Sequence, residues 1–339
     1  MRESTVHMTA PSEQARPTLT ASGRVPDFFI VGHPKSGTTA LWSMLKSHPQ
    51  IYMPENKEPY FLADELRPPA ATPRTFGVTP ATLEEYMALF AGASPGQLAG
   101  EASAPYLWSH TAAARIAEVR PEARIIAILR EPASFLHSLH LQFVQIYMEP
   151  EKDLRRALAL EDARREGRQL PAYAFWGPRG TLYSDYVRYV EQLRRYRERF
   201  PAEQLLVLIY EDYRADNEAV VRRVQRFLEV DDAQPVQVKE ANPTVGIRSQ
   251  RVHTLVHAIA SGEGALPRAV QHAARALAPR QLTRERAVAI RNRIMYSAPP
   301  EREERLMLEL RRRFLPEVQA LSEYLDRDLV TLWGYDGLV

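Results

Sequence analysis

A short apolar run, followed at once by a polar loop and then by a helix, restricts the fold of this chain more than any other feature. The run is Asp27–Gly32, the loop is His33–Gly37, and residues 38–47 have helical spacing that ends before Pro49. Nearly continuous apolar runs of this length are typical of parallel strands that are buried on both faces. The pattern therefore predicts a strand–turn–helix unit at the end of a buried parallel strand.

Two further runs of the same apolar character follow along the chain. They are Arg124–Leu129 and Leu205–Ile209, and each comes after a stretch of helical spacing, at 111–120 and at about 182–199. Weaker strand candidates are Ile51–Met53 and Gln97–Ala102. Short strands that alternate with helices predict an α/β fold, in which a central parallel sheet carries helices on both faces.

The rest of the chain adds a tail and a cap to this sheet. The polar residues 1–25 are predicted to form a flexible tail, and no segment of linker composition divides residues 26–339, so we expect a single domain. Beyond the sheet, residues 251–325 are predicted to form a helical cap. The amphipathic stretches 251–261 and 267–278 are compatible with ordinary packing, a lid, a lipid-facing surface or the face of a homodimer.

Composition excludes several classes of function. The chain has 44 basic and 42 acidic side chains, so no overall basic field recruits nucleic acid and any anion site is local. It has no cysteine, which excludes disulfides, thiolate catalysis and cysteine zinc sites. His253 and His257 are spaced as a metal pair, but no carboxylate motif accompanies them, and we predict no metal.

The sequence shows no pattern typical of a signal peptide or of a membrane-spanning helix. The polar N-terminal residues contain no apolar core of signal-peptide type. No stretch approaches the roughly 20 apolar residues that a membrane helix needs. The sequence therefore predicts a cytoplasmic protein with no transmembrane segment.

The loop after the first strand has the composition of an anion site. Backbone N–H groups at the start of a helix have no partner within the helix, and the helix dipole adds positive potential there. Gly37 allows the chain to approach a phosphate closely, while Ser36, Thr38 and Thr39 add hydroxyl groups and Lys35 adds a positive charge. We expect these five residues to bind a phosphate-like group.

The loop differs from the phosphate loop of nucleotide triphosphatases. Gly32 and Gly37 have the required spacing, but Thr38 stands where that motif has lysine, and Lys35 lies inside the loop instead. This arrangement fits one phosphate that carries a group to be transferred, rather than a triphosphate held by a metal. A phosphate-loop nucleotide kinase or NTPase is the alternative, although no apolar strand ends in a clear metal-binding aspartate.

A second anion site is predicted at the end of the strand Arg124–Leu129. Arg130 follows the strand directly, and Pro132 is well placed as the first residue of the next helix. Ser138 comes eight residues after Arg130, about two turns into that helix. An arginine binds phosphate through two parallel hydrogen bonds, and a helix hydroxyl can complete the shell.

These motifs carry a resemblance to a known family. Pro34–Thr39 resembles the 5′-phosphosulfate loop of sulfotransferases that use PAPS (3′-phosphoadenosine 5′-phosphosulfate), and Arg130 with Ser138 resembles their 3′-phosphate motif. The resemblance covers roughly residues 27–250. It implies the P-loop-like sulfotransferase fold and transfer of a sulfonate group from PAPS, without a metal, to a hydroxyl of a small natural product, lipid or carbohydrate.

The same resemblance implies two further contacts with the nucleotide. Tyr210, at the end of the strand Leu205–Ile209, is similar to the family's tyrosine near the adenine. The family closes a late basic loop on the 3′-phosphate, and Arg248 in Asn242–Ser249 is the candidate here, although the family's Arg-Lys-Gly form is absent.

The base is implied by the stretch Asn56–Phe61. It resembles the Lys-Glu-Pro-aromatic-Phe stretch of Golgi-type heparan sulfotransferases and of many bacterial relatives, in which the glutamate is the base and the lysine lies beside it. The resemblance therefore implies that Glu58 is the base and that Lys57 lies on the acceptor side. The cap at 251–325 is expected to determine which acceptor is used.

Cytosolic members of the family use a histidine base after the third strand instead. The matching stretch here, Gly100–Tyr106, contains no histidine, which favours Glu58. Glu101 is the alternative base and an acceptor-side candidate, and Tyr183 is a second acceptor-side candidate. His33 lies within the phosphate loop, but we expect its side chain to point away from the site.

Overall fold

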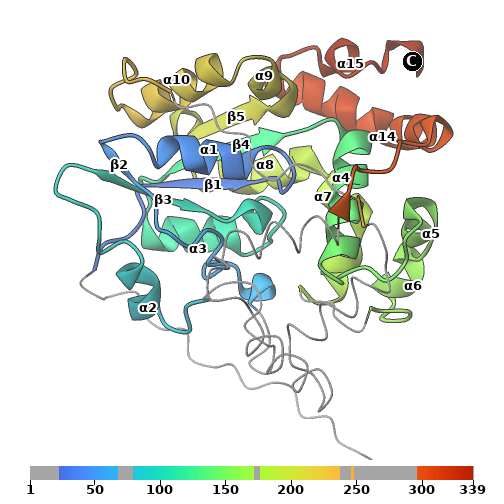
Figure 1. Ribbon diagram of the computed structural model, residues 1–339, viewed down its shortest axis with the longest axis horizontal. Helices are drawn as coiled ribbons and strands as arrows, with labels where there is room; N and C mark the ends of the chain where they lie inside the picture. The colour runs from blue at the N-terminus through green and yellow to red at the C-terminus, as the bar shows by residue number, and fades with distance from the viewer. Residues whose placement is uncertain (1–22, 68–78, 172–175, 237–245, 248–295, 339) are drawn as a thin grey trace, which may run out of the picture.

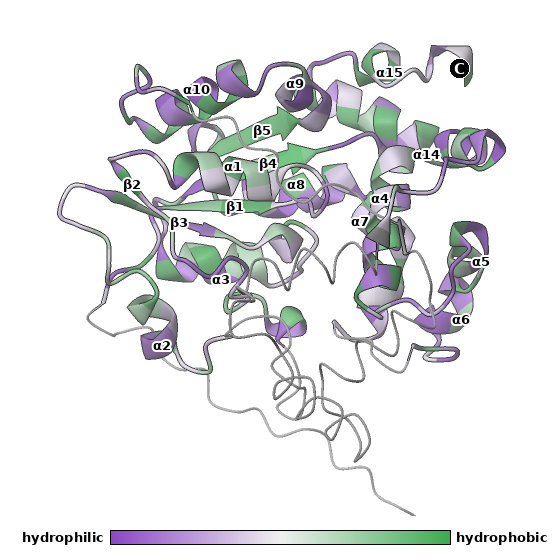
Figure 2. Cartoon of the chain, viewed as in Figure 1, coloured by the Kyte–Doolittle hydropathy of each residue, from purple (hydrophilic) through white to green (hydrophobic). Residues whose placement is uncertain are grey.

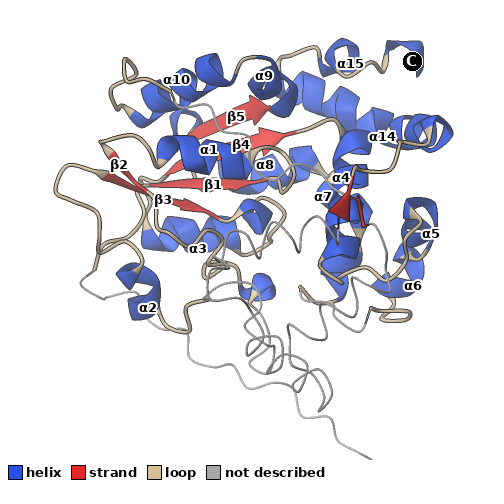
Figure 3. Cartoon of the chain, viewed as in Figure 1, coloured by secondary structure: helices blue, strands red, loops and turns tan. Residues whose placement is uncertain are grey.

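The computed structural model describes residues 23–67, 79–171, 176–236, 246–247 and 296–338. Within them, one parallel sheet has the strand order β2-β3-β1-β4-β5, which confirms the predicted α/β class (Figure 3). The strands of this sheet are β1 (Phe28–Gly32), β2 (Ile51–Tyr52), β3 (Leu98–Ala102), β4 (Arg124–Leu129) and β5 (Leu205–Ile209). A separate antiparallel pair joins β6 (Gly246–Ile247) to β7 (Tyr296–Ser297).

Helices connect the strands in the order that the sequence predicts. The stretch at 111–120 forms one helix, whereas the stretch at 182–199 is divided into two. The helices are α1 (Thr38–Leu45), α2 (Leu83–Ala88), α3 (Ala112–Val119), α4 (Pro132–Gln145), α5 (Leu154–Ala159), α6 (Glu161–Arg165), α7 (Tyr183–Tyr186), α8 (Tyr189–Arg197), α9 (Tyr210–Ala215), α10 (Asn217–Leu228), α14 (Glu304–Leu325) and α15 (Leu329–Leu332). Short 3₁₀ turns are η1 (Asp64–Leu66), η2 (Ala104–Tyr106), η3 (Pro178–Thr181), η4 (Ala202–Gln204) and η5 (Asp336–Leu338).

Successive side chains of each strand point to opposite faces of the sheet, and helices cover both faces. Both faces are therefore buried. In β1, Phe28 and Ile30 join the core beneath α1 and α10, whereas Phe29 and Val31 join the core that contains α3, α4, α8 and α14. Figure 1 shows these helices on either side of the sheet, and Figure 2 shows that β1, β4 and β5 are mainly apolar. Each fully buried aliphatic or aromatic side chain contributes roughly 1.5–3 kcal/mol, so the two-sided core fixes the strand positions.

Where the binding motifs end, the strand order creates a topological switch point, the place at which open parallel sheets form their ligand crevice. The chain leaves β1 toward β2 and β3, and it leaves β4 toward β5, so the two connections diverge at the carboxyl ends of neighbouring strands. Ligands of open parallel sheets bind at such a switch point. The loop His33–Gly37 follows β1 and Arg130 follows β4, so both predicted anion sites border this crevice.

Most of the predicted cap falls outside the described residues. Within the described part, α14 packs against α4, α8 and α15. Residues 248–295, which include Arg248, His253 and His257, lie outside the described residues, and so does most of the predicted tail. These predictions stay open.

Candidate active site

The backbone of the phosphate loop adopts a conformation at residue 37 that favours glycine. Gly37 precedes α1 with φ = 89°, and Lys35 has φ = 59°. A Cβ atom at Gly37 would lie 2.8 Å from the Tyr213 ring, so glycine is needed for space as well as for conformation. Ser36 and Thr38 are buried within the turn. The loop therefore presents backbone N–H groups at the start of a helix, as an anion site needs.

Lys35 and Arg130 bring the two predicted anion sites together. Nη1 of Arg130 donates to the backbone carbonyl of Lys35 at 2.7 Å, and its guanidinium carbon lies 4.6 Å from the centroid of the Tyr210 ring. Burial, with the charge of Arg130 adding to it, lowers the pKa of Lys35 to about 8. Nε of Arg130 is buried and has no hydrogen-bond partner among the described residues, so a donor remains for a ligand. Ser138 is buried further along α4.

Arg302 is a third cation in this region, besides Lys35 and Arg130, and the sequence motifs did not indicate it. Arg302, just before α14, donates from Nη1 to Ser134 Oγ on α4 at 3.0 Å. Burial and then the charge of Arg302 lower the pKa of His137 to about 4, so this histidine is neutral at pH 7. Arg302 lies in an acidic stretch that resembles a solvated helix start, and only the fold brings it to α4. It is a late-chain cation whose charge acts on Arg130.

Glu58 lies beside the phosphate loop. Lys57 Nζ and the Tyr60 hydroxyl each donate to a different oxygen of the Glu58 carboxylate. Lys57 Nζ also lies 3.5 Å from Oγ1 of Thr38, at the start of α1. The structure therefore joins Lys57, Glu58 and Thr38 in one chain of contacts.

The backbone around Glu58 is strained. Glu58 has φ = 65° and Tyr60 has φ = 55°, although both residues carry a Cβ atom. Such conformations cost about 1–3 kcal/mol each and concentrate at functional sites. Two hydrogen bonds offset the strain: Glu58 N donates to Ala102 O at 3.0 Å, and Tyr60 N donates to Ser103 Oγ at 3.3 Å. The strain marks this turn as a functional candidate independently of any resemblance.

Glu101 lies in the interior rather than in the crevice. Its side chain on β3 is fully buried, the Tyr86 hydroxyl donates to it, and the Tyr106 hydroxyl lies 3.4 Å from Oε2. Burial raises the pKa of Glu101 to about 7, and the negative charge of Glu58 adds to this shift. The position of Glu101 gives no direct access for an acceptor.

Tyr183 is likewise an interior residue. Its fully buried hydroxyl donates to Glu149 Oε2 at 3.2 Å and lies 2.9 Å from His140 Nδ1. Glu149 in turn accepts from both terminal nitrogens of the buried Arg164, at 2.6 and 2.8 Å. This network has the character of a structural ion pair, and it leaves the Tyr183 hydroxyl no free position toward an acceptor.

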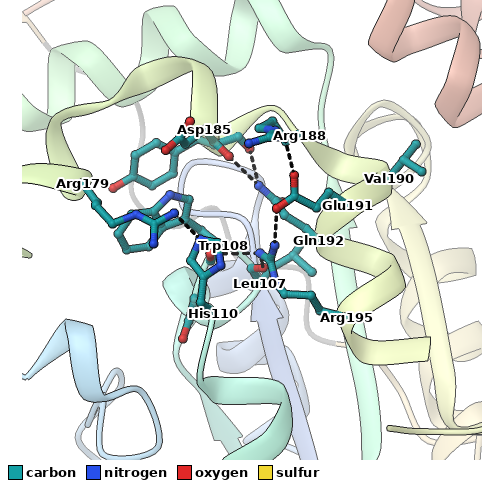
Figure 4. A network of polar contacts seen from close by, with 12 residues as sticks. Leu107, Trp108, His110, Arg179, Asp185, Arg188, Val190, Glu191, Gln192 and Arg195 are labelled. Carbon is teal, nitrogen blue, oxygen red and sulfur yellow. Dashed lines mark hydrogen bonds and ion pairs between the residues drawn. The ribbon is translucent and has the colours of Figure 1, made fainter. Parts of the chain in front are cut away.

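His33 points away from the crevice, as the sequence predicts. Its buried ring donates from Nε2 to Gln192 Oε1 on α8 at 2.6 Å, and burial lowers its pKa to about 4. Figure 4 shows Gln192 within a network of polar contacts, where its Nε2 donates to the backbone carbonyl of Asp185 at 2.9 Å. The histidine therefore ties the phosphate loop to α8.

Aromatic rings form a row that extends from Tyr60 toward Arg179. The Tyr60 and Trp176 ring centroids are 6.1 Å apart, and those of Trp176 and Trp108 are 6.5 Å apart. Beyond them, Nη2 of Arg179 lies 2.7 Å from His110 Nε2, and Figure 4 shows this pair beside Trp108. The carboxylate of Glu58 thus lies at one end of an aromatic wall.

The described residues carry no metal centre and no membrane span. Among them, no group of three or more His, Cys, Asp or Glu side chains is arranged to hold a metal ion. No helix in the same part of the chain is long and apolar enough to cross a bilayer.

Comparisons with known proteins agree with this geometry. A family model described as the sulfotransferase family matches residues 26–234. Mouse carbohydrate sulfotransferase 15 is 28% identical over 153 residues, which cover 35% of this chain and 27% of that protein. The human bifunctional heparan sulfate N-deacetylase/N-sulfotransferase 3 is 27% identical over 217 residues, which cover 61% of this chain and 22% of that protein. The chain thus spans about a quarter of the length of these curated relatives.

A solved structure extends the similarity beyond the matched segment. The crystal structure of a sulfotransferase from Alicyclobacillus acidocaldarius superposes with a TM-score of 0.64 and 25% identity. The superposition covers 91% of this chain and 99% of that one. The two chains therefore share one architecture over nearly their whole length.

Proposed function

This chain belongs to the sulfotransferase family, and we propose that it transfers a sulfonate group from PAPS to a hydroxyl group of its acceptor. One observation carries the proposal: the loop after β1 and the arginine after β4 meet at the switch point, with Arg130 Nη1 2.7 Å from Lys35 O. A nucleoside phosphorylated at both ends needs two adjacent anion sites of this kind. The buried Nε of Arg130, which has no hydrogen-bond partner within the described part of the chain, fits such a ligand.

We assign the 5′ end of the donor to the phosphate loop. Backbone N–H groups before α1 and the hydroxyls of Ser36, Thr38 and Thr39 would hold the 5′-phosphate. The ammonium group of Lys35 would stabilise the negative charge that develops on the leaving oxygen. Gly37 leaves the space for this approach.

We assign the 3′ end to Arg130 and Ser138, with Tyr210 beside the adenine. The ring of Tyr210 already stacks under the guanidinium group of Arg130, which favours one orientation of that group. Arg302, just before α14, adds a late-chain cation that contacts Ser134 on α4, and Arg248 stays a sequence-based candidate for the same end.

Glu58 is the proposed base. As the acceptor oxygen bonds to sulfur, its proton passes to the Glu58 carboxylate, and the bond between sulfur and the 5′-phosphate oxygen breaks with its electrons on that oxygen. Lys57 and Tyr60 donate to the two carboxylate oxygens, so they orient the base. Their contacts favour Glu58 over the buried Glu101.

The acceptor is proposed to be a hydroxyl of a small natural product, lipid or carbohydrate. The names of the curated relatives favour carbohydrates among these classes. Of the three predicted acceptor-side residues, Lys57 lies beside Glu58, whereas Glu101 and Tyr183 are interior. We therefore place the acceptor beside Lys57 and Glu58, next to the almost fully buried rings of Tyr60 and Trp176.

The test is transfer of label from labelled PAPS to a panel of glycans, phenols, glycolipids and peptides, in the presence of EDTA. Glu58→Gln should lower turnover about 10²–10⁴-fold and leave PAP binding unchanged, where PAP is the desulfonated nucleotide. Glu55→Gln is the matched control, because Glu55 is an exposed carboxylate on the same segment. Full turnover in the Glu58→Gln variant would show that Glu58 is not the base. Metal-dependent transfer of phosphate from ATP, without transfer from PAPS, would favour a kinase instead.

A further inference from the structure

Two carboxylates stand directly next to the nucleotide site. Glu131 follows Arg130 at the end of β4, and Glu211 follows Tyr210 at the end of β5. Both acids are close enough to act electrostatically on Arg130. Nevertheless, Arg130 forms no ion pair with any carboxylate in the part of the chain that the structure describes. Something therefore holds these two acids away from the guanidinium group.

The C-terminal segment engages both acids. The Tyr335 hydroxyl donates to Oε1 of Glu131 at 2.7 Å, and the Trp333 indole N–H donates to Oε2 of Glu211 at 2.8 Å. Tyr335 is fully buried and Trp333 is 4% exposed, so these contacts lie in the interior, where competition from water is small. Burial raises the pKa of Glu211, and the Trp333 contact opposes that shift.

Other contacts fix the geometry. Glu131 caps α4 by accepting from the backbone N–H groups of Ala133 at 3.1 Å and Ser134 at 2.7 Å. Arg327 anchors the segment on α9 through two hydrogen bonds to Asp212, at 2.6 and 2.7 Å. Figure 1 shows α15, in red, beside α9 at the same edge of the molecule.

We propose that Trp333 and Tyr335 are positioning residues of the nucleotide site: by engaging Glu211 and Glu131, they keep both carboxylates from pairing with Arg130 and leave its guanidinium group for the 3′-phosphate. The indole and the phenol donate hydrogen bonds without adding a charge of their own. Glu131 has one charged neighbour besides, because Arg311 Nε lies 3.5 Å from its Oε1. A carboxylate released from its donor would bind Arg130 in the way that a phosphate does, and would compete with it. This proposal rests on the proposed function.

The test compares the affinities for PAP and 5′-AMP in Tyr335→Phe and Trp333→Phe. Each variant should bind PAP at least tenfold more weakly, with 5′-AMP affinity within about twofold of wild type, because only PAP carries the 3′-phosphate. Tyr324→Phe is the matched control, since Tyr324 lies in the same C-terminal region and contacts neither acid. It should leave both affinities unchanged.

Rescue separates this role from ordinary packing. Adding Glu131→Gln to Tyr335→Phe, or Glu211→Gln to Trp333→Phe, should restore most of the PAP affinity, because a neutral amide does not pair with Arg130. Equal loss of PAP and 5′-AMP affinity, absence of rescue, or an unchanged preference for PAP would overturn the positioning role. If wild-type protein does not prefer PAP over 5′-AMP at all, the proposed function itself fails.

Discussion

Binding of PAP should weaken above about pH 8, because Lys35 loses its proton there. Burial, with the charge of Arg130 adding to it, lowers the pKa of Lys35 from 10.5 to about 8. Without a ligand, Lys35 is therefore charged below pH 8 and increasingly neutral above it. A bound phosphate stabilises the charged form and retains the proton to higher pH. The contribution of Lys35 to the affinity is consequently constant well below pH 8 and falls as the pH rises through this value.

The size of this effect follows from the pKa of Lys35. If the bound phosphate restores the ordinary pKa of 10.5, the charged form of the site binds on the order of 300-fold more tightly than the neutral form. The dissociation constant for PAP should then be about tenfold larger at pH 9 than at pH 7. At pH 9, binding should also take up close to one proton per site, on the order of 0.9.

Isothermal titration calorimetry of PAP from pH 6.5 to 9.5, in buffers of different ionisation enthalpy, measures both quantities. The phosphate groups of the ligand keep their charge over the upper part of this range, since their second pKa is about 6. Lys35→Met should bind PAP weakly and without the change near pH 8, whereas Lys35→Arg should stay charged throughout. An unchanged dissociation constant for wild-type protein between pH 7 and 9 would refute the reasoning.

Three substitutions test other parts of the account. Arg130→Ala should weaken PAP binding about 10- to 100-fold and 5′-AMP binding less than threefold; equal losses in a binding titration would remove the 3′-phosphate assignment. Gly37→Ala should cost about 1–2 kcal/mol of unfolding free energy in urea, because φ is 89° there and the new Cβ meets the Tyr213 ring; a neutral result would show that the turn relaxes. Arg164→Met should cost about 3–5 kcal/mol by leaving Glu149 buried without its partner, and adding Glu149→Leu should recover most of this loss; a change below about 1 kcal/mol would contradict the buried pair.

The sheet was predictable because its signal is local. A strand buried on both faces reads as a continuous apolar run, and Arg124–Leu129 and Leu205–Ile209 match β4 and β5 residue for residue. Pro132 marks the first residue of α4, as its fixed φ predicts. By contrast, the stretch at 182–199 is split at Val187 and Arg188, where no proline or glycine gives a warning.

The surroundings of the site were less predictable because they depend on contacts between distant segments. Local motifs in the sequence singled out Glu58 and Arg130, and the structure places Lys57, next to Glu58, against the start of α1 and Arg130 against the backbone of Lys35. It gave no signal for Arg302, which reaches α4 only through the packing of α14. It also placed Glu101 and Tyr183 on the acceptor side, because residue type and order do not say which way a side chain points.

The most direct test of the central claim is a crystal structure of the protein with saturating PAP. The account predicts the 5′-phosphate at the backbone N–H groups of Ser36–Thr39 and the 3′-phosphate within hydrogen-bond distance of Arg130. The carboxylate of Glu58 should face the open side of the 5′-phosphate, where a sulfonate group would be attached. PAP bound elsewhere, or a crevice without nucleotide at saturating concentration, would contradict the account.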